Sequence, residues 1–506
     1  MKPSAVWILA IAVSAATVPA RAQNARLVSP DWPHMAALEH LQRAGVVTLD
    51  PLTRPWSQAD VVRALERVDT SAVAPAIAQL VARLRANLAA DTMGLAVDAF
   101  VGALAASDAG RWALRPAPDS SSGLFPLAGI SASLRFPHVA VVTSPRIDNR
   151  LRSDPDYRGK KDRFIAGRNP EVYVAAAWPL AEVFVGQVDR NWGPEGIESL
   201  VLSSSPYTYD HFFVRLGPAR LRLELLATQL DNRYNVDGTD NRQRFLSAHR
   251  LIVQPTSRLT LSLFESTLYA DASTERSFEP WYLNPANLFL LAQYDGVETS
   301  NALVGADVVH RGERLTLAGQ VYLDNVQVDD SVARDRQPPG YGVTFVAGGG
   351  ALSGRATWQA LYTRVTNLAY RTQAAEEAYL YREVGIGRNW ADYDQATVRL
   401  SVLAHPRLLW GAELSWLRQG EGDPRAPFPP DSLLAATPTT FAGTVERTAR
   451  LAGRAEWWPR RGVLLRGELG LNLLDNAGHS AGASRTRWVW RLNALVRRRW
   501  KGALPL

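Results

Sequence analysis

Aromatic and planar polar side chains gather in three long polar segments of the sequence, and these residue types are suited to binding carbohydrate. A polysaccharide site needs flat apolar faces that stack on sugar C–H groups, with planar hydrogen-bonding groups at their edges. The candidate carbohydrate-binding residues are Arg190, Asn191, Trp192, Tyr207, Trp281, Tyr282, Asn284 and Trp390. The alternative is that these aromatic residues only pack the protein, as buried aromatic rings commonly do. Trp192 and Trp281 would then pack loops against each other.

Sequence signals for catalysis are weak. No Gly-x-Ser-x-Gly motif and no His-Glu-x-x-His motif occurs, and the 8 His residues lack the spacing of metal ligands. The pair Asp210-His211 suggests a general base, but adjacent strand residues point to opposite faces, so the two side chains would not meet. We therefore expect no enzyme activity, no catalytic residue, no metal and no cofactor. A hydrolase built on a barrel is the less favoured alternative.

The first residues have the features of a secretory signal peptide, predicted to span residues 1–22. Lys2 supplies the charged start, residues 6–18 an apolar stretch, and residues 20–22 a cleavage site with small side chains. The 506 residues include no Cys, which excludes disulfide bonds and Cys-bound metals from the exported chain. The net charge of +7 at pH 7 is too small to indicate a nucleic-acid partner.

Residues 23–122 are predicted to form a small α-helical bundle. Apolar residues recur at helical spacing in 33–45, 57–68 and 72–90. The bundle would plug a larger body. A second role stays open, because residues 32–65 resemble a surface-layer-homology repeat, a module that grips cell-wall polymers. Contact with peptidoglycan is therefore the alternative for this segment.

Beyond Gly123 the apolar residues recur with a period of two, which predicts β-strands. Leucines alternate with Arg and Glu in residues 220–225, and the same pattern returns in 449–457 and 487–496. One face of each strand is apolar and the other is charged. A soluble sandwich would show this alternation too, so the pattern alone does not decide between the two folds.

The lengths of the connections favour a membrane barrel. Links of about two residues, such as 179–180, alternate with long links such as 189–210 and 419–445. Outer-membrane barrels have this asymmetry, with tight periplasmic turns and long external loops. With 128–143 taken as one bent strand we count about 16 strands, and two more would fit in the longest loops. We therefore expect an antiparallel outer-membrane β-barrel of about 16–18 strands over residues 123–506.

Residues 186–206 resemble a segment of the capsule-assembly Wzi family. There Arg190-Asn191-Trp192-Gly193-Pro194 leads into Leu200-Val201-Leu202-Ser203, and Glu195 stands where the family more often has Gly. The likeness continues through 279–307, and a helical segment before a long alternating region is also the family's layout. The resemblance implies an outer-membrane β-barrel with a periplasmic helical bundle. It also implies a lectin-like role in retaining capsular polysaccharide at the cell surface.

We therefore expect a lectin-like protein of a Gram-negative type of outer membrane, with its helical domain in the periplasm. It would bind and retain capsular or other surface polysaccharide in capsule assembly. The expected partners are this polysaccharide, outer-membrane lipids and, as the open alternative above, peptidoglycan; we expect no nucleic-acid partner and a monomer. The main alternative function is that of a diffusion porin with an open lumen.

Overall fold

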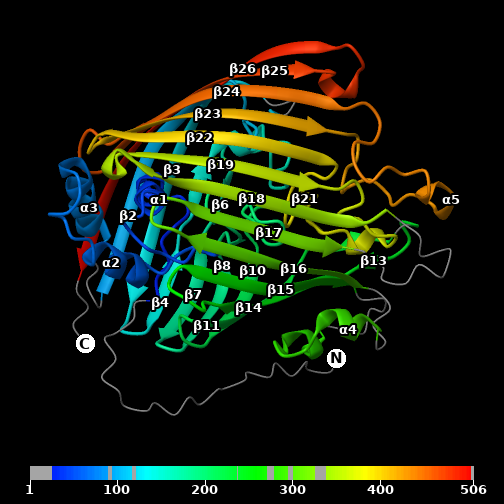
Figure 1. Cartoon of the computed structure of the whole chain (residues 1–506), viewed down its shortest axis with the longest axis horizontal. Coiled ribbons are helices and arrows are strands. Elements are labelled where there is room, and N and C mark those ends of the chain that lie inside the picture. The colour runs from blue at the N-terminus through cyan, green and yellow to red at the C-terminus, as the bar shows by residue number, and fades with distance from the viewer. Residues whose placement is uncertain are drawn as a thin grey trace.

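The computed structural model describes residues 25–88, 94–116, 121–235, 237–270, 279–294, 300–324 and 338–502. The predicted signal peptide lies outside the described residues. Within them, three N-terminal helices precede a closed antiparallel β-barrel of 18 strands (Figure 1). The prediction of a mainly β protein with an antiparallel barrel and an N-terminal helical part is confirmed.

Neighbouring barrel strands are paired in sequence order, and the ring closes where β2 pairs with both β3 and β26. The barrel strands are β2 (Gly94–Ala106), β3 (Gly123–Arg135), β4 (Val139–Thr143) with β5 (Arg146–Asp148), β6 (Gly167–Arg168) with β7 (Val172–Trp178), β8 (Ala181–Gln187), β10 (Asp210–Leu216), β11 (Leu221–Gln229), β14 (Arg244–Val253), β15 (Leu259–Ala270), β16 (Ser300–Arg311), β17 (Thr316–Asp324), β18 (Gly340–Ala351), β19 (Ala356–Val365), β22 (Tyr393–His405), β23 (Leu408–Gln419), β24 (Glu446–Trp457), β25 (Val463–Asp475) and β26 (Ser484–Gly502). β4 with β5, and β6 with β7, each form one interrupted strand.

The two strands missing from our count of about 16 do not lie in the long loops. One is β2, which falls inside residues 23–122, the segment predicted to be helical, so the barrel begins at Gly94 and not at Gly123. The inward side chains Phe100 and Leu104 pack in a small apolar core. They are therefore as apolar as the outward side chains of β2, and this part of the strand does not show the alternation of apolar and polar residues. The other arises because a turn ends β3 at Arg135 and splits the predicted bent strand.

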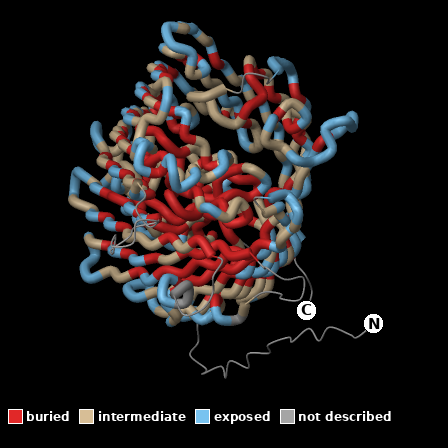
Figure 2. Tube along the Cα trace, turned by 90° about the vertical axis from the view of Figure 1, so that its right-hand side faces the viewer, coloured by how far each residue is buried: buried red, intermediate tan, exposed pale blue. Residues whose placement is uncertain are grey.

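The outer face of the barrel is apolar and the inner face is largely polar. Exposed apolar side chains on the strands include Val101, Leu263, Phe345, Leu414 and Trp488. Buried polar and charged side chains inside include Glu224, Arg250, Asp307, Gln320 and Thr344. Figure 2, which views the end with the long loops, shows buried segments crossing the interior of the barrel. The outer face is therefore suited to lipid, and protein segments occupy much of the interior.

The two ends of the barrel differ as the connection lengths predict. Short turns lie at one end, beside the N-terminal helices, and we call it the short-turn end (Figure 1). The opposite, long-loop end carries α4 (Phe289–Tyr294), α5 (Asp431–Leu434), the hairpin of β12 (Arg233–Tyr234) with β13 (Asn241–Arg242), and that of β20 (Leu380–Tyr381) with β21 (Val384–Gly385). The loop between β8 and β10 departs from this plan, as described below.

Three amphipathic helices close the short-turn end: α1 (Met35–Arg43), α2 (Gln58–Glu66) and α3 (Pro75–Leu88). Their buried apolar side chains share one core with the barrel residues Leu403, Leu409, Trp458 and Leu464. A ring nitrogen of His40 also lies 2.9 Å from the carbonyl oxygen of Gly354. The helices are therefore docked against the barrel wall by a continuous apolar core.

Among the described residues, no helix is long and apolar enough to cross a membrane.

Candidate functional site

The segment between β8 and β10, residues 188–209, folds into the lumen, and we call it the inserted loop. Its short strand β9 (Asn191–Trp192) pairs with β1 (Thr53–Arg54), which belongs to the N-terminal part of the chain. Near its tip, Glu195 Oε1 lies 3.0 Å from Nη1 of Arg43 on α1. The loop therefore runs from the long-loop end to the N-terminal helices.

Side chains of the barrel wall hold the inserted loop in place. Gln320 on β17 donates from Nε2 to the Trp192 carbonyl at 2.7 Å and accepts from the Leu200 amide at 2.7 Å. Arg399 on β22 donates to the Gly196 carbonyl at 2.8 Å, and Gln359 on β19 to the Glu195 carbonyl at 2.8 Å. The loop is thus bonded to the wall along its length and occupies part of the lumen.

A buried ion pair joins the inserted loop, the N-terminal part and the wall. Arg250 donates from Nε to Glu224 at 2.8 Å and from Nη1 to the Leu52 carbonyl at 3.1 Å, and its Nη2 bonds Thr53 Oγ1. Its Cζ lies 4.4 Å from the ring of Trp192. The side chains of Arg250 and Glu224 are both 0% exposed. Charges buried this deeply need their partners, so this cluster fixes the two inserted segments together.

The structure buries five of the eight predicted binding residues: Arg190, Asn191, Trp192, Tyr207 and Tyr282. Trp192 is 2% exposed, so it has no free face for a sugar. Its burial follows from the inward course of the inserted loop, which the sequence pattern placed outside. Tyr282 stacks on Tyr269 with ring centroids 4.4 Å apart. As arranged here, these five side chains pack the protein and offer no stacking surface.

The other three predicted residues lie in two different places. Trp281, which is 50% exposed, and the exposed Asn284 belong to the segment before α4. Trp390 lies between β21 and β22, and it is only partly buried. Trp390 lines both cavities described below, whereas Trp281 and Asn284 line neither. The structure therefore does not bring the eight residues together in one site.

Trp390 instead meets Trp112, which the sequence analysis did not single out. The two ring centroids lie 5.4 Å apart with planes at 61°, and both rings are partly buried. Arg111 lies over the Trp112 ring and Arg115 over the Trp390 ring, with Cζ at 5.4 and 5.6 Å from the centroids. Trp112 was missed because it stands in the segment predicted to be helical, although the run Arg111-Trp112 to Arg115 has the aromatic and planar polar character that we sought elsewhere.

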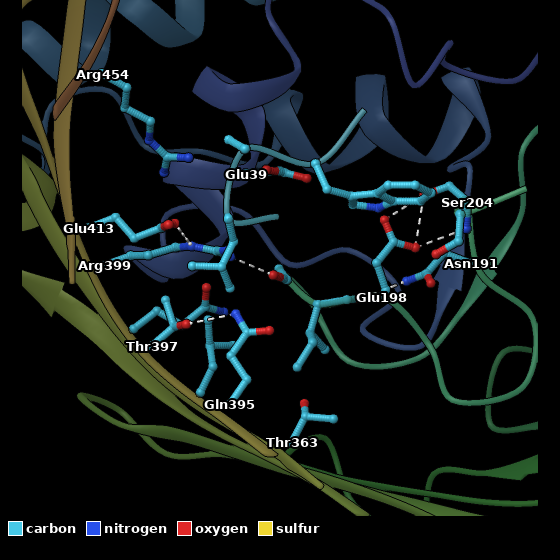
Figure 3. A pocket seen from close by; sticks show the side chains of 18 of the residues that line it. Glu39, Asn191, Glu198, Ser204, Thr363, Gln395, Thr397, Arg399, Glu413 and Arg454 are labelled. Atoms are coloured by element: carbon cyan, nitrogen blue, oxygen red, sulfur yellow. Dashed lines mark hydrogen bonds and ion pairs between the residues drawn. The ribbon is translucent and has the colours of Figure 1, made fainter. Parts of the chain in front are cut away.

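The lumen holds a polar cavity of about 560 Å³ between the N-terminal helices and the tryptophan pair. Labelled side chains around it are Glu39, Asn191, Glu198, Ser204, Thr363, Gln395, Thr397, Arg399, Glu413 and Arg454 (Figure 3). Many of them bond to each other: Arg399 donates to Glu413 at 2.8 Å, and the Ser204 amide donates to Glu198 at 3.0 Å. This cavity is a polar chamber bounded by α1 at its inner end.

A second cavity of about 480 Å³ lies at the long-loop end, and we call it the vestibule. It shares Arg111, Trp112, Leu114, Asn389 and Trp390 with the lumen cavity. Its other charged lining residues are Arg115, Asp156, Glu421, Asp423, Arg425, Glu446, Arg485 and Arg487. The tryptophan pair therefore stands between the vestibule and the lumen cavity. Aromatic faces with planar arginine donors beside them are what the stacking of sugars requires.

Asp210 and His211, the two residues considered as a general base, do not form a catalytic pair. Gln187 Nε2 donates to Asp210 Oδ2 at 2.9 Å, whereas Arg190 Nε donates to Nε2 of His211 at 2.8 Å. The two side chains thus have separate partners on the two sides of β10. Among the described residues, no cluster of three or more His, Cys, Asp or Glu residues is arranged to hold a metal ion.

A closed antiparallel barrel with an apolar outer face, long loops at one end and tight turns at the other defines an outer-membrane β-barrel protein. Its fold is similar to that of Escherichia coli Wzi, an outer-membrane protein involved in group 1 capsule assembly and a carbohydrate-binding β-barrel. The TM-score is 0.64 at 14% identity, and the match covers 94% of this chain and 100% of Wzi. The fold that the sequence resemblance implied is therefore present.

Two porin-like barrels are more distant in fold. Pseudomonas aeruginosa OccD3 has a TM-score of 0.46 at 10% identity, covering 81% of this chain and 92% of its own. Acinetobacter baumannii OccAB4 has a TM-score of 0.46 at 8% identity, covering 81% and 99%. No family model and no curated protein matches the sequence.

Proposed function

We propose that the protein is lectin-like: it binds capsular or other surface polysaccharide in the vestibule and retains it at the cell surface without hydrolysing it. The observation that carries this proposal is the pair of partly exposed rings, Trp112 and Trp390, flanked by Arg111 and Arg115. The short-turn end then faces the periplasm, and the vestibule faces outward. The carbohydrate binding named for Wzi supports the same function.

Sugar rings would stack on the tryptophan pair while arginines donate to their hydroxyl or acid oxygens. Arg485 and Arg487 add donors at the vestibule rim, and Arg487 donates only to the Pro116 carbonyl among the described residues, at 3.5 Å. The inserted loop is bonded across the lumen below the vestibule, so it would hinder the passage of a bound chain through the barrel. This combination favours retention of a polymer over its passage.

Two predicted partners of the protein stay predictions. Contact of the N-terminal helices with peptidoglycan would place residues 29–88 against the cell wall. Outer-membrane lipids would surround the apolar outer face, with the protein as a monomer.

Measuring the affinity of the purified protein for surface polysaccharide tests the proposal. Trp112→Ala and Trp390→Ala each remove a stacking face, and we expect a loss of about 1–2 kcal/mol, or roughly 5- to 30-fold in Kd. Trp281→Ala is the matched control, because this exposed ring lies in another loop. Unchanged size of the recovered polysaccharide would show binding without turnover.

The outcomes separate the site from the function. If only Trp281→Ala loses affinity, the polysaccharide is bound by the loop before α4, and the vestibule is not the site. If the wild-type protein does not bind the polysaccharide at all, the lectin function itself is wrong. Heat-modifiable migration on semi-native gels checks that each variant still folds as a barrel.

A further inference from the structure

A third cavity of about 610 Å³ opens at the short-turn end, between the N-terminal helices and the wall of β2, β25 and β26. It shares no lining residue with the vestibule or the lumen cavity. The proposed polysaccharide site therefore does not account for it.

Arginine dominates the lining of this cavity. The cationic residues are Arg83, Arg146, Arg407, Arg460, Arg461, Arg497, Arg498 and Arg499, against Asp31, Asp98 and Glu171 as acids. Two of the acids are already paired: Arg499 contacts Asp98 at 2.7 Å, and Arg146 contacts Asp31 at 2.5 Å. The cavity therefore carries an excess of positive charge even with every acid ionised.

Five of these arginines, Arg83, Arg407, Arg460, Arg461 and Arg498, have no carboxylate partner among the described residues. Arg83 donates to the Pro406 carbonyl at 2.8 Å and Arg407 to the Pro459 carbonyl at 2.7 Å. Arg460 and Arg461, exposed on the turn between β24 and β25, have no hydrogen bond or ion pair from their side chains in the described part of the chain. Cations gathered without counter-charges repel each other, and an anion between them would relieve the repulsion.

An aromatic wall stands beside the arginines. The His34 ring lies 5.2 Å from the Trp32 ring and 5.3 Å from the Trp458 ring, centroid to centroid. Burial, together with the charges of Arg83, Arg497 and Arg499, lowers the pKa of His34 to about 3, so the imidazole is neutral. Asn87 Nδ2 lies 3.3 Å from His34 Nε2, while the buried Nδ1 has no hydrogen-bond partner. When Asn87 donates to Nε2, the ring proton is on Nδ1, which is then a free donor.

We propose that this cavity binds a phosphoryl group. Arginine forks match the oxygens of phosphate, and an anionic phosphoryl group can accept hydrogen bonds from several guanidinium groups at once. The source would be a phospholipid headgroup or a soluble phosphate. The position of the cavity along β26 favours the headgroup. Arg497 and Arg499 of this strand line the cavity, and their neighbours Arg498 and Trp500 are exposed on the outer face of the barrel, with Arg498 Cζ 5.5 Å from the Trp500 ring. Aromatic side chains of outer-membrane barrels lie at the level of the lipid headgroups.

The test uses the full-length protein in neutral detergent and two probes. Inorganic phosphate is titrated by calorimetry, and retention of phosphatidylglycerol against phosphatidylcholine from mixed micelles is measured by native mass spectrometry. The variant is Arg460→Gln with Arg461→Gln, since both residues are exposed on a turn and support no other contact. The matched control is Arg220→Gln with Arg258→Gln, which removes the same charge from other short turns.

We expect the wild-type protein to retain phosphatidylglycerol selectively. The Arg460/Arg461 variant should bind it at least about tenfold more weakly, whereas the control should bind as the wild type does. Phosphate binding by the wild type, lost in the same variant, would identify a soluble phosphate as a ligand too. The proposal is wrong if the wild type binds neither probe, or if the variant and the control bind alike. Heat-modifiable migration confirms that all three proteins are folded.

Discussion

The buried Arg250 side chain offers a sharp test of how the lumen is closed. Arg250→Met removes the contacts to Glu224, the Leu52 carbonyl and Thr53, together with the guanidinium over the Trp192 ring. Breaking a buried ion pair costs about 3–5 kcal/mol. Glu224 still has Arg215 as a partner at 2.9 Å, so we expect the free-energy cost of losing Arg250 to be about 3 kcal/mol. If this cluster holds the inserted segments, a change of this size raises the population of the open lumen about 100-fold.

Conductance in planar bilayers measures that population. The wild-type protein should be closed nearly all the time, and Arg250→Met should open frequently. Arg447→Met is the matched control, because Arg447 pairs with Asp475 at 3.1 Å on an exposed part of β24 and β25. Such a surface pair contributes about 0–1 kcal/mol, so the control should stay closed.

The double variant Glu224→Gln with Arg250→Met should be less open than Arg250→Met alone. In Arg250→Met the buried Glu224 charge keeps only one of its two arginine partners, whereas the double variant has no charge there and Arg215 keeps Glu182 at 2.9 Å. Equal closure of the wild type and Arg250→Met would refute the role given to this cluster. Large steady channels from the wild type would contradict the closed lumen itself and favour the porin.

Two further perturbations test the orientation and the contact at the tip of the inserted loop. An epitope inserted at Asp431, in α5 at the long-loop end, should be accessible to antibody on intact cells, whereas one at Arg461 should be detected only after permeabilisation; the reverse pattern would invert the orientation. Glu195→Gln removes the charge that pairs with Arg43 at 3.0 Å; the two side chains are 14% and 11% exposed. We expect this variant to open briefly more often than the wild type does, but far less often than Arg250→Met does. An opening rate equal to that of Arg250→Met would show that the loop depends on its tip and not on the buried cluster.

The barrel was predictable from the sequence wherever one face of a strand is apolar and the other polar. Residues 220–225 show this clearly, because Arg222 and Glu224 face the lumen while Leu221 meets lipid. In β2 the signal fails, since Phe100 and Leu104 pack inward as apolar residues. A period of two is visible only if the environments on the two faces differ.

The candidate site was less predictable, for two physical reasons. A polar loop rich in Gly and Ser reads as external, yet residues 188–209 are stabilised inside by wall residues such as Gln320 and Arg399, which stand far away in the sequence. In addition, Trp112 and Trp390 meet only because the ring closes between β2 and β26. Both kinds of contact join residues far apart in the sequence, so neither produces a pattern within a short stretch of the chain.

The central claim is that the vestibule retains polysaccharide at the cell surface through its tryptophan pair. The most direct measurement compares cell-bound with released polysaccharide in a capsule-forming strain that lacks this protein and is complemented with the wild type or with Trp112→Ala/Trp390→Ala. Retention should be restored by the wild type and not by the double variant at equal amounts of folded barrel. Full retention with the double variant would contradict the account.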